Sequence, residues 1–292
     1  MSQSRRQLAQ IAISRALRVR KAAGYSLRCA ISAYDLCERL GVAVWFSDIP
    51  SMEGVYIPDA KPRPAILVSS LRPAGRQSVT CGHEMGHHVF EHGEQWDEIV
   101  EQRTEARRFD PKEYQADLFS AALHMPKIAV NHALNRRGLD ARTCPAESVY
   151  ALAKYFGVGY GTLVTHMART LNIIDSDRAD ELLRHQPKDI RARLLGKTCP
   201  DDLIVADVHW TDRAIDVQVG DMIVLPAGTG IEGRCISIIE ESSTRSLVKA
   251  EMPGIGRAAN DSLGWAAYVR VMRKDYVGRA PLRFDEEVDD VE

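Results

Sequence analysis

The chain has 292 residues, of which 45% are hydrophobic, and its formal net charge is −2 at pH 7. This length can bury a substantial core and predicts two domains. The near-neutral charge argues against a generally basic nucleic-acid-binding protein. No apolar run approaches the roughly 18 residues that predict a membrane span. Six scattered cysteines without a Cys-x-x-Cys pair predict free thiols and a cytoplasmic location.

The N-terminal segment has a basic, helical pattern. Residues 4–22 and 28–40 predict two helices, and no acidic residue precedes Asp35. An acid-free amphipathic start is also a feature of transit peptides. We interpret the first helix instead as a basic helix that lies on the domain that follows.

Three short runs after these helices predict a small sheet. Residues 42–46, 54–57 and 65–69 are rich in aliphatic and aromatic side chains, and several prolines separate the last two runs. We therefore expect three strands. An exposed edge of such a sheet can accept an extended peptide by strand addition.

Residues 83–87 read His-Glu-Met-Gly-His. Two histidines four residues apart lie on the same face of a helix, so His83 and His87 can bind one zinc ion through ring nitrogens. Glu84 can act as a general base toward a water at that ion. Because so short a pattern also occurs on ordinary solvated helices, the interpretation needs a third ligand.

A second predicted helix, over residues 112–125, offers that ligand. Glu113 is the natural candidate, and Asp117 lies four residues further on the same face. Asp117 can accept the free ring N–H of a ligand histidine, which would fix the imidazole tautomer. The metzincin pattern is excluded, because Phe90 and Gly93 stand where that pattern requires glycine and histidine.

The two motif segments resemble the ImmA/IrrE family of metallopeptidases. Residues 76–92 hold a basic residue, an apolar-Thr pair, His-Glu-apolar-Gly-His and a further histidine. Residues 113–126 hold Glu-x-x-Ala-Asp and end in Leu-x-Met-Pro. The resemblance extends over roughly residues 25–175.

This resemblance implies a zincin-like fold with His83, His87 and Glu113 as metal ligands and Glu84 as the catalytic base. Family members resemble regulatory proteases that cut helix-turn-helix repressors or antitoxin-like partners in phage, mobile-element and stress-response switches. A repressor of this kind is therefore the expected protein substrate.

The chain departs from the family pattern at three positions. Gly82 and Ser120 stand where alanine is usual, and His124 stands where leucine is usual. None of these changes removes a predicted ligand, but the replacement of leucine by His124 can change the shape of the cleft. A zinc peptidase also needs a donor for the tetrahedral oxyanion. The sequence offers four candidates for it: Tyr56, Tyr114, His124 and His132.

Residues 146–171 have the pattern of a helix-turn-helix. Its second helix carries only Arg169 as a positive charge, and phosphate contacts supply much of the affinity for DNA. We therefore prefer a packing or substrate-docking helical pair, and direct binding of nucleic acid is disfavoured.

The predicted fold class is α+β, with a zincin-like domain followed by a small all-β domain. We expect the metallopeptidase domain over residues 1–175, a helical linker over 176–200, a β domain of unknown role over 201–276 and an acidic, disordered tail over 277–292. The predicted strands of the β domain are 203–208, 215–219, 222–225, 235–239 and 268–271.

The sequence thus predicts a cytoplasmic zinc endopeptidase with a protein substrate and no membrane partner. Two alternatives remain. One is a non-proteolytic regulator that keeps zinc for structure and binds protein or DNA. The other is a zincin hydrolase of small peptides. The substitution Glu84→Gln separates the first alternative from a protease, since only a protease loses function with the base.

Overall fold

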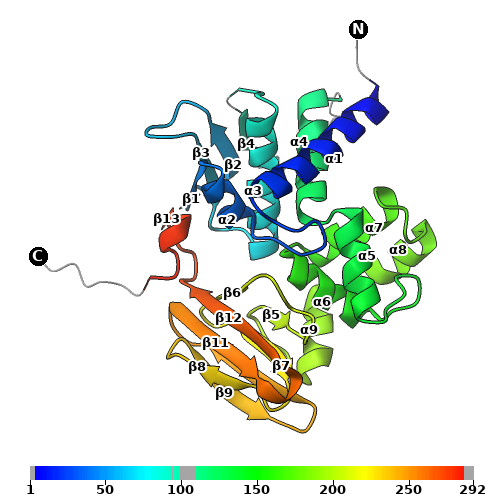
Figure 1. The fold of residues 1–292 in the computed structure, drawn as a ribbon, viewed down its shortest axis with the longest axis vertical. Coiled ribbons are helices and arrows are strands. Elements are labelled where there is room, and N and C mark those ends of the chain that lie inside the picture. The colour runs from blue at the N-terminus through cyan, green and yellow to red at the C-terminus, as the bar shows by residue number, and fades with distance from the viewer. Residues whose placement is uncertain (1–3, 94, 99–108, 286–292) are drawn as a thin grey trace, which may run out of the picture. The chain divides into compact units, whose positions relative to one another are not determined.

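The computed structural model describes residues 4–93, 95–98 and 109–285 (Figure 1). The chain divides into two units, residues 1–131 with 277–280 and residues 132–276 with 281–292. The predicted α+β class is confirmed, and the C-terminal part of the second unit is rich in strands as expected. The functional boundaries at residues 175 and 200 stay predictions, because compactness alone does not say which segments act together.

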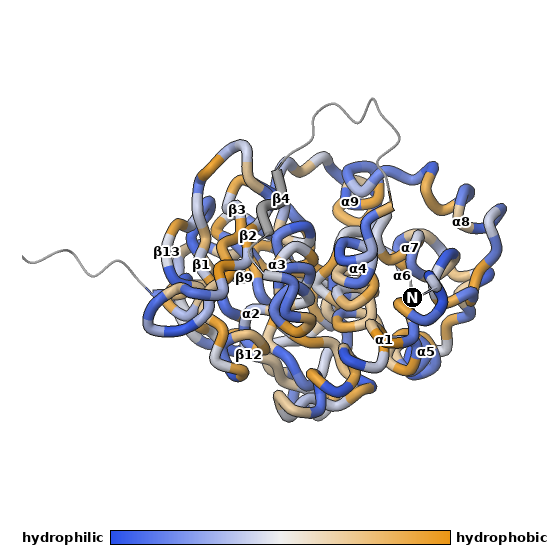
Figure 2. Tube along the Cα trace, turned by 90° about the horizontal axis from the view of Figure 1, so that it is seen from above, coloured by the Kyte–Doolittle hydropathy of each residue, from blue (hydrophilic) through white to orange (hydrophobic). Residues whose placement is uncertain are grey.

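A five-stranded sheet forms one layer of the first unit, in the order β13-β1-β3-β2-β4. Strands β1 and β3 are parallel, and the other pairs are antiparallel. The three predicted strands are confirmed to within about two residues, whereas β4 and β13 were not predicted. Figure 2 shows hydrophobic residues along β2 and β3. The strands are β1 (Ala43–Ser47), β2 (Met52–Ile57), β3 (Ala65–Ser69), β4 (Gln95–Glu98) and β13 (Gly278–Arg279).

Helix α1 (Arg5–Ala22) lies on helix α4 (Pro111–His124), which confirms a basic helix packed on the domain. Its buried Arg20 donates from Nη1 to the carbonyl of Leu123, at 2.6 Å. Helix α2 (Ala33–Arg39) is shorter than the predicted 28–40. The helix starts there because the side chain of Ser32 accepts the amide of Asp35 and caps it.

Helix α3 (Ala74–Val89) packs on strands β2 and β3 and also on α4, so most of its second half is buried. Close approach to α4 needs small residues. A Cβ at Gly86 would lie 3.0 Å from the Cα of Ala116. Asp110 caps α4, with Pro111 in its first turn. The two helices that carry the predicted motif thus lie side by side (Figure 1).

The second unit contains the predicted helical pair, α6 (Ala146–Phe156) and α7 (Tyr160–Arg169). Gly157 ends α6 with φ of 68°, a left-handed conformation that favours glycine. Helix α8 (Ser176–Leu183) packs on α7, and helix α9 (Pro187–Leu195) packs on α6, whereas α5 (Lys127–Arg136) spans the boundary between the two units, at residues 131 and 132.

Two four-stranded sheets follow in the second unit, in the orders β5-β7-β10-β9 and β6-β12-β11-β8. The five predicted strands are present, but β8, β10 and β11 were missed. Their sequences contain glycine, alanine and charged residues that weaken the strand pattern. The strands are β5 (Leu203–Val205), β6 (Ile215–Gln218), β7 (Met222–Pro226), β8 (Gly230–Glu232), β9 (Ile236–Glu241), β10 (Arg245–Ala250), β11 (Gly254–Asn260) and β12 (Trp265–Met272).

Three further expectations concern the whole chain. None of the six cysteines is in a disulfide, as predicted. Among the described helices, none has the length and apolar character needed to cross a membrane. The predicted disordered tail is wrong for residues 277–285, which contain strand β13 and a 3-10 helix (Ala280–Leu282) with Ala280 and Phe284 buried, and residues 286–292 lie outside the described residues.

Candidate metal centre

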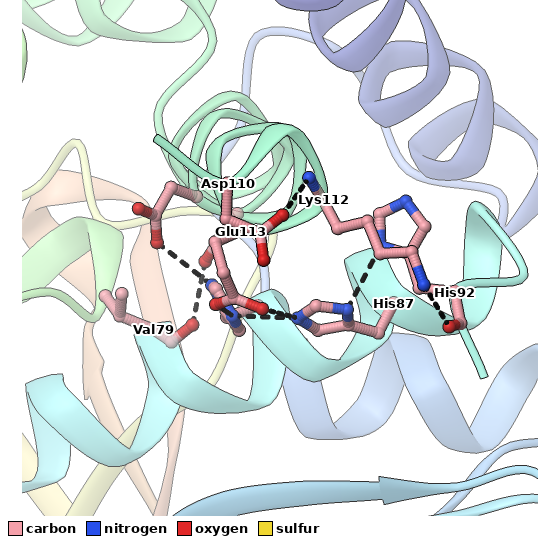
Figure 3. A network of polar contacts seen from close by, with 9 residues as sticks. Val79, His87, His92, Asp110, Lys112 and Glu113 are labelled. Atoms are coloured by element: carbon pink, nitrogen blue, oxygen red, sulfur yellow. Dashed lines mark hydrogen bonds and ion pairs between the residues drawn. The ribbon is translucent and has the colours of Figure 1, made fainter. Parts of the chain in front are cut away.

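Helices α3 and α4 bring three predicted ligands together. Nε2 of His83 lies 3.3 Å from Oε2 of Glu113, and Nε2 of His87 lies 3.5 Å from Oε1 of the same carboxylate. The two Nε2 atoms are 3.0 Å apart. Figure 3 shows His87 facing Glu113 across the space between the helices. One carboxylate and two imidazoles therefore point at a common position.

These separations fit a tetrahedral zinc site. Bonds of about 2.0–2.1 Å to a tetrahedral ion place neighbouring ligand atoms about 3.3 Å apart. The Nε2–Nε2 separation of 3.0 Å and the separations of 3.3 Å (His83 to Oε2) and 3.5 Å (His87 to Oε1) of Glu113 are close to that value. Within the described ranges, no other group of three or more His, Cys, Asp or Glu side chains is close enough to share an ion. Two imidazoles and a carboxylate are also a donor set that zinc prefers.

Each imidazole has a hydrogen-bond partner behind it. Nδ1 of His83 lies 3.0 Å from Oδ1 of Asp117, as the spacing on α4 predicts. With Nδ1–H donating to that carboxylate, Nε2 of His83 presents its lone pair to the common position. On the other imidazole, Nδ1 of His87 lies 3.1 Å from Nδ1 of His92 (Figure 3).

The sequence interpretation missed His92 as a partner. The residue is present in the motif segment, but it follows the end of α3, where helical periodicity no longer predicts direction. Lys112 of α4 donates from Nζ to the backbone carbonyl of His92, at 3.0 Å, and so holds this turn against α4. The position of His92 thus depends on both helices.

Burial keeps His87 and its neighbour His92 neutral. The pKa of His87 is lowered to about 4, mainly by burial and then by the neighbouring His83, while Glu113 acts in the opposite direction. Burial and the charge of Lys112 also lower the pKa of His92. At neutral pH these rings therefore keep lone pairs, the form in which imidazole binds a metal.

Glu84, the predicted base, is fully buried where α3 meets strand β2. Gly54 of β2 makes room for it, since a Cβ at this position would lie 3.1 Å from Oε1 of Glu84 and 2.4 Å from Cγ2 of Thr80. The sequence interpretation did not single out Gly54. A glycine inside a predicted strand is the signal that marks such close approach.

The sequence model of the IrrE N-terminal-like domain family, Peptidase_M78, matches residues 37–167. Over these residues the chain is similar to that family. The resemblance predicted from the two motif segments is thereby confirmed, and with it a metallopeptidase-type domain. None of the curated proteins matches the chain.

The IrrE-like domain includes the complete cluster of His83, His87 and Glu113, together with Glu84 and Asp117. It extends from the end of α2 through α7, so the helical pair α6–α7 belongs to the matched region. Helix α1 and the strand-rich segment after α9 lie outside it.

The candidates for an oxyanion donor differ in their surroundings. Oη of Tyr56 lies 2.7 Å from Nδ1 of His88, and burial raises the pKa of this tyrosine. His124 is fully buried, so its ring does not line an open surface. Tyr114 is partly exposed beside Phe109. The fourth candidate, His132, belongs to the second unit.

Proposed function

We propose that the IrrE-like domain is a zinc-dependent endopeptidase. His83, His87 and Glu113 are its metal ligands, and Glu84 is its catalytic base. The observation that carries this proposal is that the two Nε2 atoms lie 3.0 Å apart and that each lies close to one oxygen of the Glu113 carboxylate, at 3.3 Å from Oε2 for His83 and 3.5 Å from Oε1 for His87. Three ligands of this kind use three of four tetrahedral positions and leave one for water or substrate.

Zinc bound at this position would lower the pKa of a water to about 7 and polarise the scissile carbonyl. Glu84 accepts the proton of the attacking water and later delivers it to the leaving amine nitrogen. Burial of its carboxylate against Gly54 limits competing contacts with bulk water. Asp117 and His92 hold the two imidazoles in the tautomer with free Nε2 lone pairs.

The proposed substrate is a protein, and specifically a helix-turn-helix repressor or a similar regulator. Similarity to the family supports a peptide substrate, and the resemblance to ImmA/IrrE proteins supports a regulatory one. Arg169 is the single arginine or lysine among the ten residues of α7, which favours protein docking over DNA binding for the α6–α7 pair.

The test compares the unaltered chain with Glu84→Gln and with Glu241→Gln, an exposed control on strand β9. Each chain is co-expressed with candidate helix-turn-helix repressors, fragments are identified by mass spectrometry, and bound metal is measured by elemental analysis. We expect Glu84→Gln to keep zinc and lose cleavage, while the control keeps both. Cleavage that survives in Glu84→Gln, or an unaltered chain without tightly bound transition metal, contradicts the proposal.

A further inference from the structure

The ring of His124 occupies space that only glycine leaves on helix α3. A Cβ at Gly82 would lie 2.6 Å from Cε1 of His124 and 2.7 Å from Oγ of Ser120. Real Cβ atoms do not approach carbon or oxygen so closely. His124 and Ser120 are both buried. Gly82 is therefore matched sterically to two side chains of α4, and it directly precedes the proposed ligand His83.

Hydrogen bonds orient this buried ring. Nδ1 of His124 lies 2.9 Å from the carbonyl oxygen of Ser120, so Nδ1 carries the hydrogen. Nε2 is then the acceptor for Oγ of Ser78 on α3, at 3.0 Å. The imidazole thus connects its own helix to α3 through a hydroxyl that lies one turn before Gly82.

A second polar contact reaches the helical backbone next to the metal cluster. Oγ of Ser120 donates to the carbonyl of Val79, at 2.7 Å. In an α-helix this carbonyl also accepts the amide of the residue four positions on, which here is His83. Ser120 is therefore connected to the backbone that carries one of the imidazoles.

These contacts lie on the same interface between α3 and α4 that brings the three proposed metal ligands together. Glu113, Asp117, Ser120 and His124 follow one another at intervals of four, three and four residues, which places them on one face of α4. The first two face the imidazoles, and the last two face Ser78 and Gly82. A shift or rotation of α4 at the His124 end would therefore move the carboxylates at the other end.

We infer that His124 is a positioning residue for the metal centre. With Ser78 and Ser120 it fixes how α4 sits on α3, and so it sets the reach of Glu113 to the two imidazoles. Metal centres need their ligands held to within about 0.5 Å, and side chains that orient ligands typically change metal affinity by about 10–100-fold. The inference rests on the metal site of the proposed function.

The test measures Co²⁺ affinity and the visible absorption of bound Co²⁺ in the metal-stripped full chain. His124→Leu replaces the imidazole with an apolar side chain of similar size and removes both of its hydrogen bonds, and Ser120→Ala removes one hydroxyl. The matched control is Leu123→Ala, a buried neighbour about 100° around the helix, whose carbonyl bonds to Arg20 of α1. Thermal unfolding of each metal-free chain shows how much stability every substitution removes.

We expect His124→Leu to weaken Co²⁺ binding about tenfold or more and to change the absorption spectrum, and Ser120→Ala to weaken binding several-fold. Leu123→Ala should lower the unfolding temperature yet bind Co²⁺ within twofold of the unaltered chain. Gly82→Ala should destabilise the chain strongly, but far less when combined with His124→Ala, because the added methyl group then has room.

Three results would overturn the inference, and the third is distinguishable from the first two. If His124→Leu and Ser120→Ala both bind Co²⁺ within twofold of the unaltered chain, or if Leu123→Ala weakens binding equally, the positioning role is wrong while the metal centre stands. If the unaltered chain binds no Co²⁺, the proposed function fails and this inference fails with it. Should His124→Leu not fold, Ser120→Ala decides the question alone.

Discussion

The carboxylate of Glu84 lies directly against Gly54, on the strand next to the edge of the sheet. A side chain at position 54 would meet both this carboxylate and the methyl group of Thr80, so helix α3 can approach β2 only over glycine. The position of the proposed base is therefore set by the sheet as much as by the helix that carries it.

Gly54→Ala should for this reason reduce both activity and stability. The new Cβ would lie 2.4 Å from Cγ2 of Thr80, so α3 or β2 must shift, and overpacking of this kind costs about 1–3 kcal/mol. We expect a lower unfolding temperature and a fall of at least about tenfold in peptidase rate, because displacement of the base weakens proton transfer.

The matched control for this change is Gly230→Ala on strand β8. A Cβ there meets only the carbonyl of Ala259, at 3.8 Å, and the backbone is not left-handed. Gly230→Ala should leave the unfolding temperature and the peptidase rate nearly unchanged. Equal behaviour of the two variants in calorimetry and in the peptidase assay would show that the contact with Glu84 has no consequence.

Asp117→Asn should weaken metal binding without loss of fold stability. The side chain of Asp117 is 73% exposed, yet its carboxylate lies 3.0 Å from Nδ1 of His83. Loss of the negative charge reduces the basicity of that imidazole, and changes of this type cost about 10–100-fold in metal affinity. Exposed substitutions otherwise change stability by about 0.5 kcal/mol or less.

Zinc affinity by competition with a chelator measures this effect, and thermal unfolding of the metal-free chain measures stability. Asp180→Asn, an exposed aspartate on α8, is the control and should alter neither. A zinc affinity of Asp117→Asn equal to that of the control would mean that the hydrogen bond to His83 does not act on the metal.

The sequence predicted the part of the centre that depends on helical spacing. His83 and His87, four apart on one helix, and Glu113 and Asp117, four apart on another, have directions fixed by local periodicity. Only the meeting of the two helices is tertiary, and the family pattern supplied it. His92 and Gly54 were missed because one follows a helix end and the other acts through a side chain that it lacks.

The three departures from the family pattern illustrate the same limit. In the sequence, Gly82, Ser120 and His124 are three separate changes, and position 82 is about 40 residues from the other two. In the structure they contact one another, and the glycine makes room for the imidazole. A single sequence gives the size of each residue but not which sizes must fit together.

Strand β13 was missed for a related reason, because two residues carry no period and its partner β1 is distant in the chain.

Asp216→Asn should destabilise the second unit at neutral pH by about 3 kcal/mol, the usual cost of breaking a buried ion pair. Nε and Nη2 of Arg270 donate to this carboxylate at 2.5 and 2.8 Å. Burial acts to raise the pKa of Asp216, but Arg270, with Arg283 and Arg213, outweighs it and lowers the pKa.

A lowered folded-state pKa gives a defined pH dependence for Asp216. The stabilisation is complete above the unfolded value of about 3.9 and is lost as the pH falls through the lower folded value. Hydrogen exchange of amides in β6 and β12 follows unfolding of this unit. If acid lowers the protection of these amides by the same amount in Asp216→Asn as in the unaltered chain, groups other than Asp216 cause the effect.

Asp221, in the same unit, should show the opposite dependence. Burial raises its pKa to about 6, and the nearby charge of Asp202 adds to this, although the amides of Gln218 and Asp202 donate to its oxygens. Because the folded-state pKa lies above the unfolded value of about 3.9, its stabilising contribution is full below that value and is lost as the pH rises through 6.

Between pH 7 and pH 5 the unaltered second unit should therefore gain about 1 kcal/mol that Asp221→Asn does not gain. The two carboxylates weaken the fold in opposite directions of pH. Asp216 does so as the pH falls, because guanidinium groups lower its pKa, and Asp221 does so as the pH rises, because burial and another carboxylate raise its pKa. The combined contribution of these two carboxylates is therefore largest between about pH 4 and pH 6. Hydrogen exchange of β6 amides in the unaltered chain, in Asp216→Asn and in Asp221→Asn measures this contribution, and a contribution that is largest above pH 7 would contradict it.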